Sequence, residues 1–164
     1  MFASAAIDPG TKLLLLEAGS PPKGAVDLLD LGCGYGPIAL TLARRAPDAT
    51  VWAVDVNRRA LDLCAANAAA NGLTNVRVVR PDDVPPEIRL AGIWSNPPIR
   101  IGKSALHDLL LMWLERLDDG AGAWLVVQKH LGSDSLARWL DESGWPAIRR
   151  VSRSGYRVLE VHRR

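Results

Sequence analysis

The chain has 164 residues, which is enough for one folded domain with a buried core and too few for two. Hydrophobic residues make up 48% and charged residues 23%, a balance that excludes a disordered chain and predicts one domain over residues 1–164. No run approaches the ~20 apolar residues that span a bilayer, and the N-terminus lacks the features of a signal peptide. We therefore expect a cytoplasmic protein with no membrane partner.

Cysteine, histidine and arginine usage narrows the kinds of site further. Cys33 and Cys64 lie far apart in the sequence and there are only three histidines, so we predict reduced cysteines and no metal site. The net charge is +2, yet residues 149–164 hold six arginines and a single acidic residue, Glu160. This excess indicates either a polyanionic partner such as RNA or a solvated sheet edge that charge protects from aggregation.

Hydrophobic periodicity and turn residues predict strands that alternate with helices. Apolar and β-branched runs predict strands over residues 26–30, 50–54, 76–79, 91–95 and 123–127. Helical spacing predicts helices over residues 37–46, 58–71, 104–117 and 135–143, the third with Leu106, Leu110, Trp113 and Leu117 on its inner face. Two final strands, over residues 148–151 and 157–161, should be antiparallel because only a turn separates them.

This order of elements predicts an α/β fold with a Rossmann-like, mostly parallel sheet, helices on both faces and an antiparallel last strand. In such sheets, ligands bind beyond the carboxyl ends of the strands, near the point where the strand order reverses. Side chains that directly follow strands are therefore the candidates for a site.

A glycine loop follows the first strand. Gly32, Gly34 and Gly36 let the backbone turn tightly and approach a ligand, and the next helix offers free N–H groups to an anion. We expect the whole loop, Cys33 included, to bind a cofactor. Asp30 ends the strand, where its carboxylate either favours a positively charged cofactor or holds the amides of the loop. The Gly-x-Gly-x-Gly spacing alone does not decide between cofactors.

Two further acidic positions follow strands. Asp55, with Val56 beside it, stands at the end of the second strand, where a carboxylate can accept hydrogen bonds from both hydroxyls of an adenosine ribose. This placement fits NAD as well as S-adenosylmethionine. Asp82 and Asp83 follow the third strand, where they either bind an adenine amino group or cap a helix before Val84.

The motif Asn96-Pro97-Pro98 closes the fourth strand and is the candidate catalytic group. The prolines fix the backbone and remove its N–H donors, which leaves acceptors in a rigid frame. The Asn96 side-chain oxygen and the Pro97 carbonyl could each accept one N–H of a planar amino group and point its lone pair at a methyl donor. A simple strand-terminating turn is the alternative, and the glycine loop with Asp55 in register favours the site.

The segments 30–39, 54–57, 67–72 and 95–103 together resemble the small-domain class I methyltransferases, in particular the catalytic half of bacterial 16S ribosomal RNA guanine-N2 methyltransferases. The resemblance implies a sheet of seven strands, S-adenosylmethionine as cofactor and an amino nitrogen as acceptor. It also implies that residues 1–24, with Phe2 and Thr11, fold over the cofactor or acceptor, and that Asn96 lies beside the cofactor.

The sequence departs from this family in two respects. An aromatic residue usually follows Asn-Pro-Pro and stacks on the acceptor, whereas Ile99 stands here, so an apolar wedge or another ring such as Phe2 would hold a flipped base. The ribosomal enzymes also carry an N-terminal recognition half that these residues do not contain, so an accessory subunit could deliver the substrate.

Methylation of a base amino nitrogen in RNA, guanine N2 in ribosomal RNA above all, is the leading functional hypothesis. Lys103, Lys129, Gln128 and His130 follow strand ends and could contact phosphate or acceptor. The alternatives are methylation of a protein glutamine or a small-molecule amine, a cofactor-binding partner without activity, and an NAD-dependent dehydrogenase.

Overall fold

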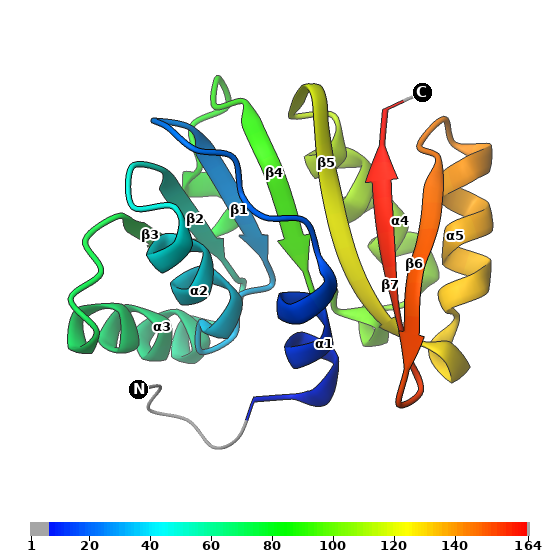
Figure 1. Ribbon diagram of the computed structural model, residues 1–164, viewed down its shortest axis with the longest axis horizontal. Helices are drawn as coiled ribbons and strands as arrows, with labels where there is room; N and C mark the ends of the chain where they lie inside the picture. Colours follow the sequence, from blue (N-terminus) through cyan, green and yellow to red (C-terminus); the bar gives the residue numbers. More distant parts are fainter. Residues whose placement is uncertain (1–6, 164) are drawn as a thin grey trace.

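The computed structural model describes residues 7–163. Its core is a seven-stranded sheet in the order β3-β2-β1-β4-β5-β7-β6 (Figure 1). The strands are β1 (Asp27–Leu31), β2 (Thr50–Val54), β3 (Val76–Val79), β4 (Leu90–Ser95), β5 (Leu117–Gln128), β6 (Ala147–Arg153) and β7 (Tyr156–His162). Strand β7 pairs antiparallel with both β5 and β6, and the other pairings are parallel. The predicted fold class is confirmed.

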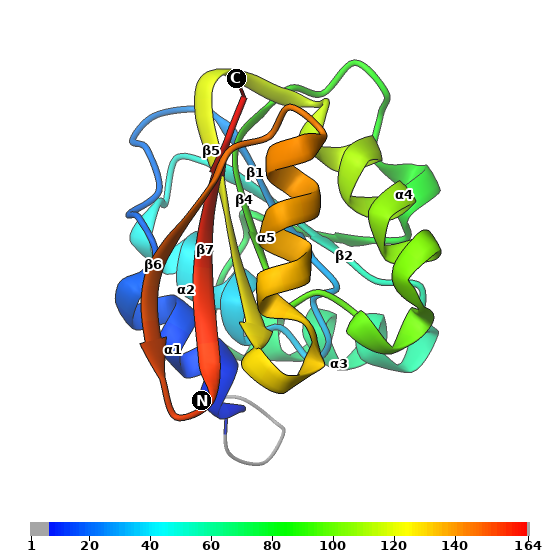
Figure 2. The ribbon, with the colours of Figure 1, turned by 90° about the vertical axis from the view of Figure 1, so that its right-hand side faces the viewer.

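Helices cover both faces of the sheet (Figures 1 and 2). The helices are α1 (Pro9–Glu17), α2 (Pro37–Arg45), α3 (Arg58–Ala70), α4 (Lys103–Leu114) and α5 (Ser133–Glu142), with short 3-10 helices η1 (Pro81–Asp83), η2 (Ile99–Ile101) and η3 (Lys129–Leu131). Helices α1, α2 and α3 pack on one face, where Leu14 and Leu28 are buried. Helices α4 and α5 pack on the other, where Leu110 and Leu125 are buried. No helix within residues 7–163 is long and apolar enough to cross a membrane.

Helices α2 and α3 begin and end where their residues require it. Gly36, with φ 106°, turns the chain into α2, and Pro37 occupies its first turn, where a missing N–H costs nothing. The side chain of Asn57 caps α3 by accepting hydrogen bonds from the backbone N–H groups of Arg59 and Ala60. Gly72, with φ 66°, follows the end of that helix.

The boundary between α4 and β5 differs from the prediction, because α4 ends at Leu114 and Leu117 already belongs to β5. Leu117 pairs with Leu90, and the N–H of Leu90 donates to the carbonyl of Arg116 at 2.8 Å. Its side chain is fully buried, as it would be on the inner face of a longer helix. The helical spacing from Trp113 to Leu117 is therefore a coincidence of two buried positions in different elements.

The strand order reverses between β1 and β4, and this reversal places the candidate motifs side by side. The chain runs outward from β1 to β3 and returns to β4 on the other side of β1. Leu31 pairs with Ser95, whose buried hydroxyl donates to the Leu31 carbonyl at 2.6 Å. The glycine loop after β1 and Asn96 after β4 therefore leave the sheet as neighbours, at the position where α/β proteins bind ligands.

Candidate active site

The glycine loop is tied to the end of β2. The N–H groups of Gly32 and Cys33 both donate to the Val54 carbonyl, at 2.8 and 2.9 Å. Gly34 has φ 56° and donates its N–H to Asp55 Oδ2 at 3.0 Å. A Cβ on Gly34 would meet no atom within 4 Å, so the backbone here borders open space. The loop therefore presents bare main chain to a ligand.

Behind the loop, its other side packs closely on α3. A Cβ on Gly36 would lie 2.7 Å from Cys64 Sγ. Cys33 and Cys64, distant in sequence, are both free and buried here, and their mutual hydrogen bond together with burial raises the pKa of the Cys33 thiol. The buried Asn67 donates its side-chain N–H to the Tyr35 carbonyl at 2.8 Å. Any contact of Cys33 with a cofactor would therefore involve its main chain, since its side chain lies in the core.

Asp30 is fully buried beneath this loop. Its Oδ2 accepts the N–H of Ala39, in the first turn of α2, at 2.9 Å, while its Oδ1 has no hydrogen-bond partner among residues 7–163. Desolvation raises the pKa of this carboxyl to about 8, and the nearby charge of Asp55 adds to the rise. Asp30 thus holds an amide of α2 and none of the loop's own amides, and its Oδ1 is left without a partner among residues 7–163.

Asp55 lies at the end of β2 and uses both carboxylate oxygens. Oδ2 accepts from Gly34, and Oδ1 accepts the N–H of Asn57 at 2.9 Å. The side chain of Val56, which follows, is 69% exposed and offers an apolar surface beside the carboxylate. Asp82 and Asp83 are exposed and lie within η1 itself, not at its cap position.

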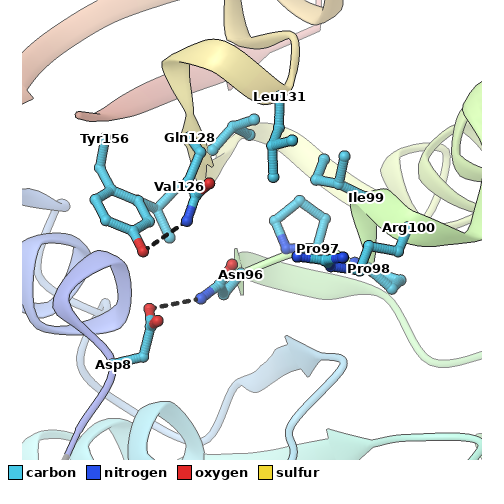
Figure 3. A pocket seen from close by; sticks show the side chains of 11 residues that line it. Asp8, Asn96, Pro97, Pro98, Ile99, Arg100, Val126, Gln128, Leu131 and Tyr156 are labelled. Atoms are coloured by element: carbon cyan, nitrogen blue, oxygen red, sulfur yellow. Dashed lines mark hydrogen bonds between the residues drawn. The ribbon is translucent and has the colours of Figure 1, made fainter.

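Asn96 is held in one orientation by two residues of the α1 segment. Its Nδ2 lies 3.1 Å from Asp8 Oδ2 and 3.1 Å from Thr11 Oγ1 (Figure 3). A carboxylate can only accept hydrogen bonds, so the amide must turn its NH₂ group toward Asp8. The side-chain oxygen of Asn96 is consequently left to accept from a ligand. Asp8 Oδ2 also accepts the Thr11 N–H at 3.0 Å and thereby caps α1.

Asn96 borders a cavity of ≈ 350 Å³ between the ends of β4, β5 and β7. It is lined by Asp8, Asn96, Pro97, Pro98, Ile99, Arg100, Val126, Val127, Gln128, Leu131 and Tyr156. Apolar groups form most of this lining, and the polar side chains of Asp8, Gln128 and Tyr156 lie on one side of it with Asn96, whereas Arg100 lies beside Ile99 and Pro98 (Figure 3). The Pro97 carbonyl accepts the Ile99 N–H at 2.9 Å and keeps its second lone pair.

The other predicted residues lie at varying distances from this cavity. Lys103 begins α4 and lines a smaller cavity of ≈ 160 Å³ that shares Ile99 and Leu131 with the first. Lys129 is exposed in η3. Phe2 lies outside the described residues.

Sequence reasoning missed Asp8 and Tyr156. Asp8 precedes Pro9 in a pattern typical of a helix N-terminus, which could have revealed α1. Tyr156 lies opposite Gln128 through the antiparallel pairing of β5 with β7, and no local pattern fixes that register.

Four of the C-terminal arginines form ion pairs with carboxylates. Arg149 and Arg157 both contact Asp134, Arg150 contacts Glu160 at 3.4 Å, and Arg153 contacts Glu17 at 3.3 Å. These pairs tie β6 and β7 to α5 and α1. They favour the interpretation of this segment as a solvated sheet edge over that of a free polyanion-binding surface.

A glycine loop after β1, an acidic residue after β2 and Asn-Pro-Pro after β4, on a sheet of this topology, define a class I methyltransferase that uses S-adenosylmethionine. The chain belongs to the methyltransferase small domain family, whose model matches residues 1–160.

The comparisons with known proteins agree with this assignment. The chain is 38% identical over 145 residues to the uncharacterized protein YbxB of Bacillus subtilis, covering 87% of this chain and 72% of that one. It is 34% identical to ribosomal RNA small subunit methyltransferase C of Shewanella halifaxensis, covering 84% of this chain and 41% of that one.

Among solved structures, a 16S rRNA N2 G1207 methyltransferase of T. thermophilus, in complex with AdoMet and guanosine, matches with a TM-score of 0.80 and 26% identity. The match covers 99% of this chain and 45% of that one. The chain thus spans less than half the length of the ribosomal RNA methyltransferases that it resembles.

Proposed function

We propose that this domain transfers a methyl group from S-adenosylmethionine to the exocyclic amino nitrogen of a base in RNA, guanine N2 in ribosomal RNA in particular. The observation that carries the proposal is the fixed amide of Asn96. Asp8 and Thr11 accept hydrogen bonds from its NH₂ group, so that its oxygen and the Pro97 carbonyl remain as two acceptors beside an apolar cavity.

Two observations fit the cofactor to the first half of the site. The open space at Gly34 leaves room for a ligand against the main chain, and a cation bound near the unpartnered Oδ1 of Asp30 would lower the raised pKa of this carboxyl and favour its charged form. The loop from Gly32 to Gly36, with Asp30, would hold the methionine end, Asp55 the ribose, and Val56, Asp82 and Asp83 the adenine. When bound, S-adenosylmethionine supplies an electrophilic methyl group.

The residues of the chain orient the acceptor nitrogen. Its lone pair is delocalised into the ring, so the nitrogen becomes a nucleophile only when its geometry is made pyramidal. The Asn96 oxygen and the Pro97 carbonyl each accept one N–H, which holds the nitrogen with its lone pair directed at the methyl group. The nitrogen becomes acidic once it carries positive charge, and its surplus proton then passes to water without a strong base.

The size and charge of the site support a nucleotide acceptor. A flipped base would lie between Ile99 and the other apolar side chains of the cavity, with Arg100 and Lys103 near its rim. Two of the named relatives are ribosomal RNA methyltransferases, and the structure of one of them is in complex with guanosine. We also propose that an accessory subunit takes part in recognition of the RNA and that the reaction takes place in the cytoplasm.

Incubation with cofactor labelled in its methyl group tests the proposal. The acceptors are naked ribosomal RNA, assembled small subunits and total protein, and nuclease digestion then identifies the methylated base. We expect label on guanine N2 for the wild type and none for Asn96→Ala, with calorimetry showing that this variant still binds S-adenosylhomocysteine. Label in protein or in a small molecule, with none in RNA, would reject the RNA proposal, and binding of NAD alone would reject methyl transfer.

A further inference from the structure

A second pair of polar side chains faces the same cavity and has no part in orienting the amino group. Gln128 ends β5, Tyr156 begins β7, and the two are directly opposite in the antiparallel register. Gln128 Nε2 donates to Tyr156 Oη at 2.9 Å (Figure 3). Both side chains line the cavity together with Asn96 and Pro97.

The hydrogen bond between them determines what each can offer a ligand. The amide of Gln128 donates one N–H to Tyr156, so its NH₂ group faces the tyrosine and its oxygen remains an acceptor. This oxygen has no partner among residues 7–163. Tyr156 Oη accepts that N–H, so its own hydrogen remains available for donation. This side of the cavity therefore offers an acceptor from Gln128 and a donor from Tyr156, close to the acceptors of Asn96 and Pro97 (Figure 3).

The packing of α1 holds Tyr156 in this place. A Cβ on Gly10 would lie 2.5 Å from the Cε1 atom of the tyrosine ring, so the ring lies directly against the helix backbone. The same helix carries Thr11 and follows Asp8, the two residues that orient Asn96. The α1 segment therefore holds both Asn96 and Tyr156 in place.

This arrangement of donors and acceptors matches one base among the four of RNA. In adenine and cytosine, the ring nitrogen next to the exocyclic amino group is an acceptor, and uracil has no amino group. Only guanine has a ring N–H, at N1, next to its amino group, followed by a carbonyl oxygen at C6. An acceptor beside the amino-binding pair is therefore compatible with guanine and repels the edge of adenine or cytosine.

We infer that Gln128 and Tyr156 select guanine, with Gln128 Oε1 accepting the N1 hydrogen and Tyr156 Oη donating to O6. The inference rests on the proposed function and deepens it by naming the residues that choose the base. These residues contact the ring and not the reacting nitrogen, so they determine specificity without taking part in methyl transfer.

Binding of nucleosides in the presence of S-adenosylhomocysteine tests the inference. Guanosine carries the amino group, the N1 hydrogen and O6, whereas 2-aminopurine riboside keeps the amino group and lacks the other two. Ligand-observed nuclear magnetic resonance gives the dissociation constants. We expect the wild type to bind guanosine about tenfold or more tightly than 2-aminopurine riboside, since the analogue leaves two polar groups of the site unpaired.

Three variants separate the roles. Gln128→Leu should weaken guanosine binding about tenfold and should leave 2-aminopurine riboside binding as strong as before or stronger, so the difference between the two dissociation constants becomes smaller. Tyr156→Phe should weaken guanosine and inosine alike, because both present O6. Gln128→Glu keeps an acceptor for the N1 hydrogen but cannot donate to Tyr156, whose hydroxyl would then donate to the carboxylate, so this variant should lose the O6 contact and resemble Tyr156→Phe. Unchanged binding of S-adenosylhomocysteine in every variant shows that the fold is intact.

The outcomes distinguish this inference from the proposed function. If the wild type methylates guanine but Gln128→Leu keeps the full preference for guanosine, the inference is wrong and the function stands. A preference for adenosine would show that the amide of Gln128 faces the cavity with its NH₂ group, which also overturns the inference. If neither nucleoside binds and no RNA is methylated, both are rejected.

Discussion

A single carboxylate oxygen, Asp8 Oδ2, connects the start of a helix to the catalytic motif. It accepts the Thr11 N–H and so caps α1, and it accepts Asn96 Nδ2 and so determines which end of that amide faces the acceptor. A neutral amide or hydroxyl at position 8 would do this less well, because such groups can donate as well as accept. The orientation of Asn96 therefore depends on a residue 88 positions away in the sequence.

The variant Asp8→Ser separates these two tasks. Serine caps helices about as well as aspartate, so the free energy of unfolding should stay within about 0.5 kcal/mol of the wild-type value. Its hydroxyl no longer forces the NH₂ group of Asn96 toward α1, so we expect kcat to fall about tenfold with the KM for cofactor unchanged. Asp8→Ala should lose kcat similarly and also about 1 kcal/mol of stability. Wild-type kcat in Asp8→Ser would show that Asn96 needs no such partner.

Asp30 makes the stability of the cofactor-free protein depend on pH. Its pKa is about 8 in the folded protein and near 3.8 in an unfolded chain. Between these values the folded state holds a proton that the unfolded state has released, so the contribution of Asp30 to stability falls as pH rises through this window.

Asp30→Asn, which cannot ionise, is the reference for this effect. Urea denaturation at about pH 5 and about pH 8 should show the stability of the wild type falling relative to that of the variant as pH rises. A difference that stays constant between the two pH values would mean that the carboxyl does not titrate in this range.

At the scale of elements, the sequence predicts the helices and strands whose ends are marked by local residues. Proline and glycine mark the beginnings and ends of α2 and α3, and alternation with β-branched runs marks the strands. Helix α1 was missed although Asp8 and Pro9 form a local helix-start pattern, and the contacts that bury it come from residues far along the chain. Gly10 packs on Tyr156, and Thr11 contacts Asn96.

The residues of the candidate site likewise fall into two groups, those that a local pattern predicts and those that it does not. The residues of the glycine loop, Asp55 and Asn96 were predicted because each directly follows a parallel strand, and the topology brings such positions together. Asp8 and Tyr156 reach the cavity through a helix contact and an antiparallel register, neither of which a local pattern encodes. For this reason, prediction from one sequence identified the candidate chemistry and missed the residues that orient it.

The contact between Gly10 and Tyr156 can be tested by a double-mutant cycle. Gly10→Ala should cost about 1–3 kcal/mol of stability, although alanine favours helices, because its methyl group would collide with the tyrosine ring. In a Tyr156→Ala background the same substitution should cost much less, since the ring is gone. Urea denaturation of the four proteins gives the coupling energy. Additive effects would indicate that α1 and β7 adjust independently.

At the scale of the whole molecule, the distribution of paired and unpaired charge differs from the distribution in the sequence. Arginine is densest in the C-terminal segment, yet four of its arginines contact carboxylates of α1, α5 or β7. In contrast, Arg100, Lys103 and Lys129 form no ion pair within residues 7–163 and follow the ends of β4 and β5. These three cations therefore remain available to a polyanion at the end of the sheet that carries the cavity.

RNA binding should consequently depend on these few residues and not on the arginine-rich strands. Each of Arg100→Gln and Lys129→Gln removes at most one phosphate contact, so each should weaken binding and lower the slope of log K against log salt by about 0.7–0.9. Arg149→Gln is the matched control, because it removes the same charge from an arginine that already contacts Asp134. Fluorescence anisotropy with a ribosomal RNA fragment, between about 50 and about 200 mM salt, measures both quantities. An equal loss in Arg149→Gln would mean that exposed ion pairs open readily for RNA, since such pairs are individually weak, and that the whole C-terminal hairpin contributes to the RNA-binding face.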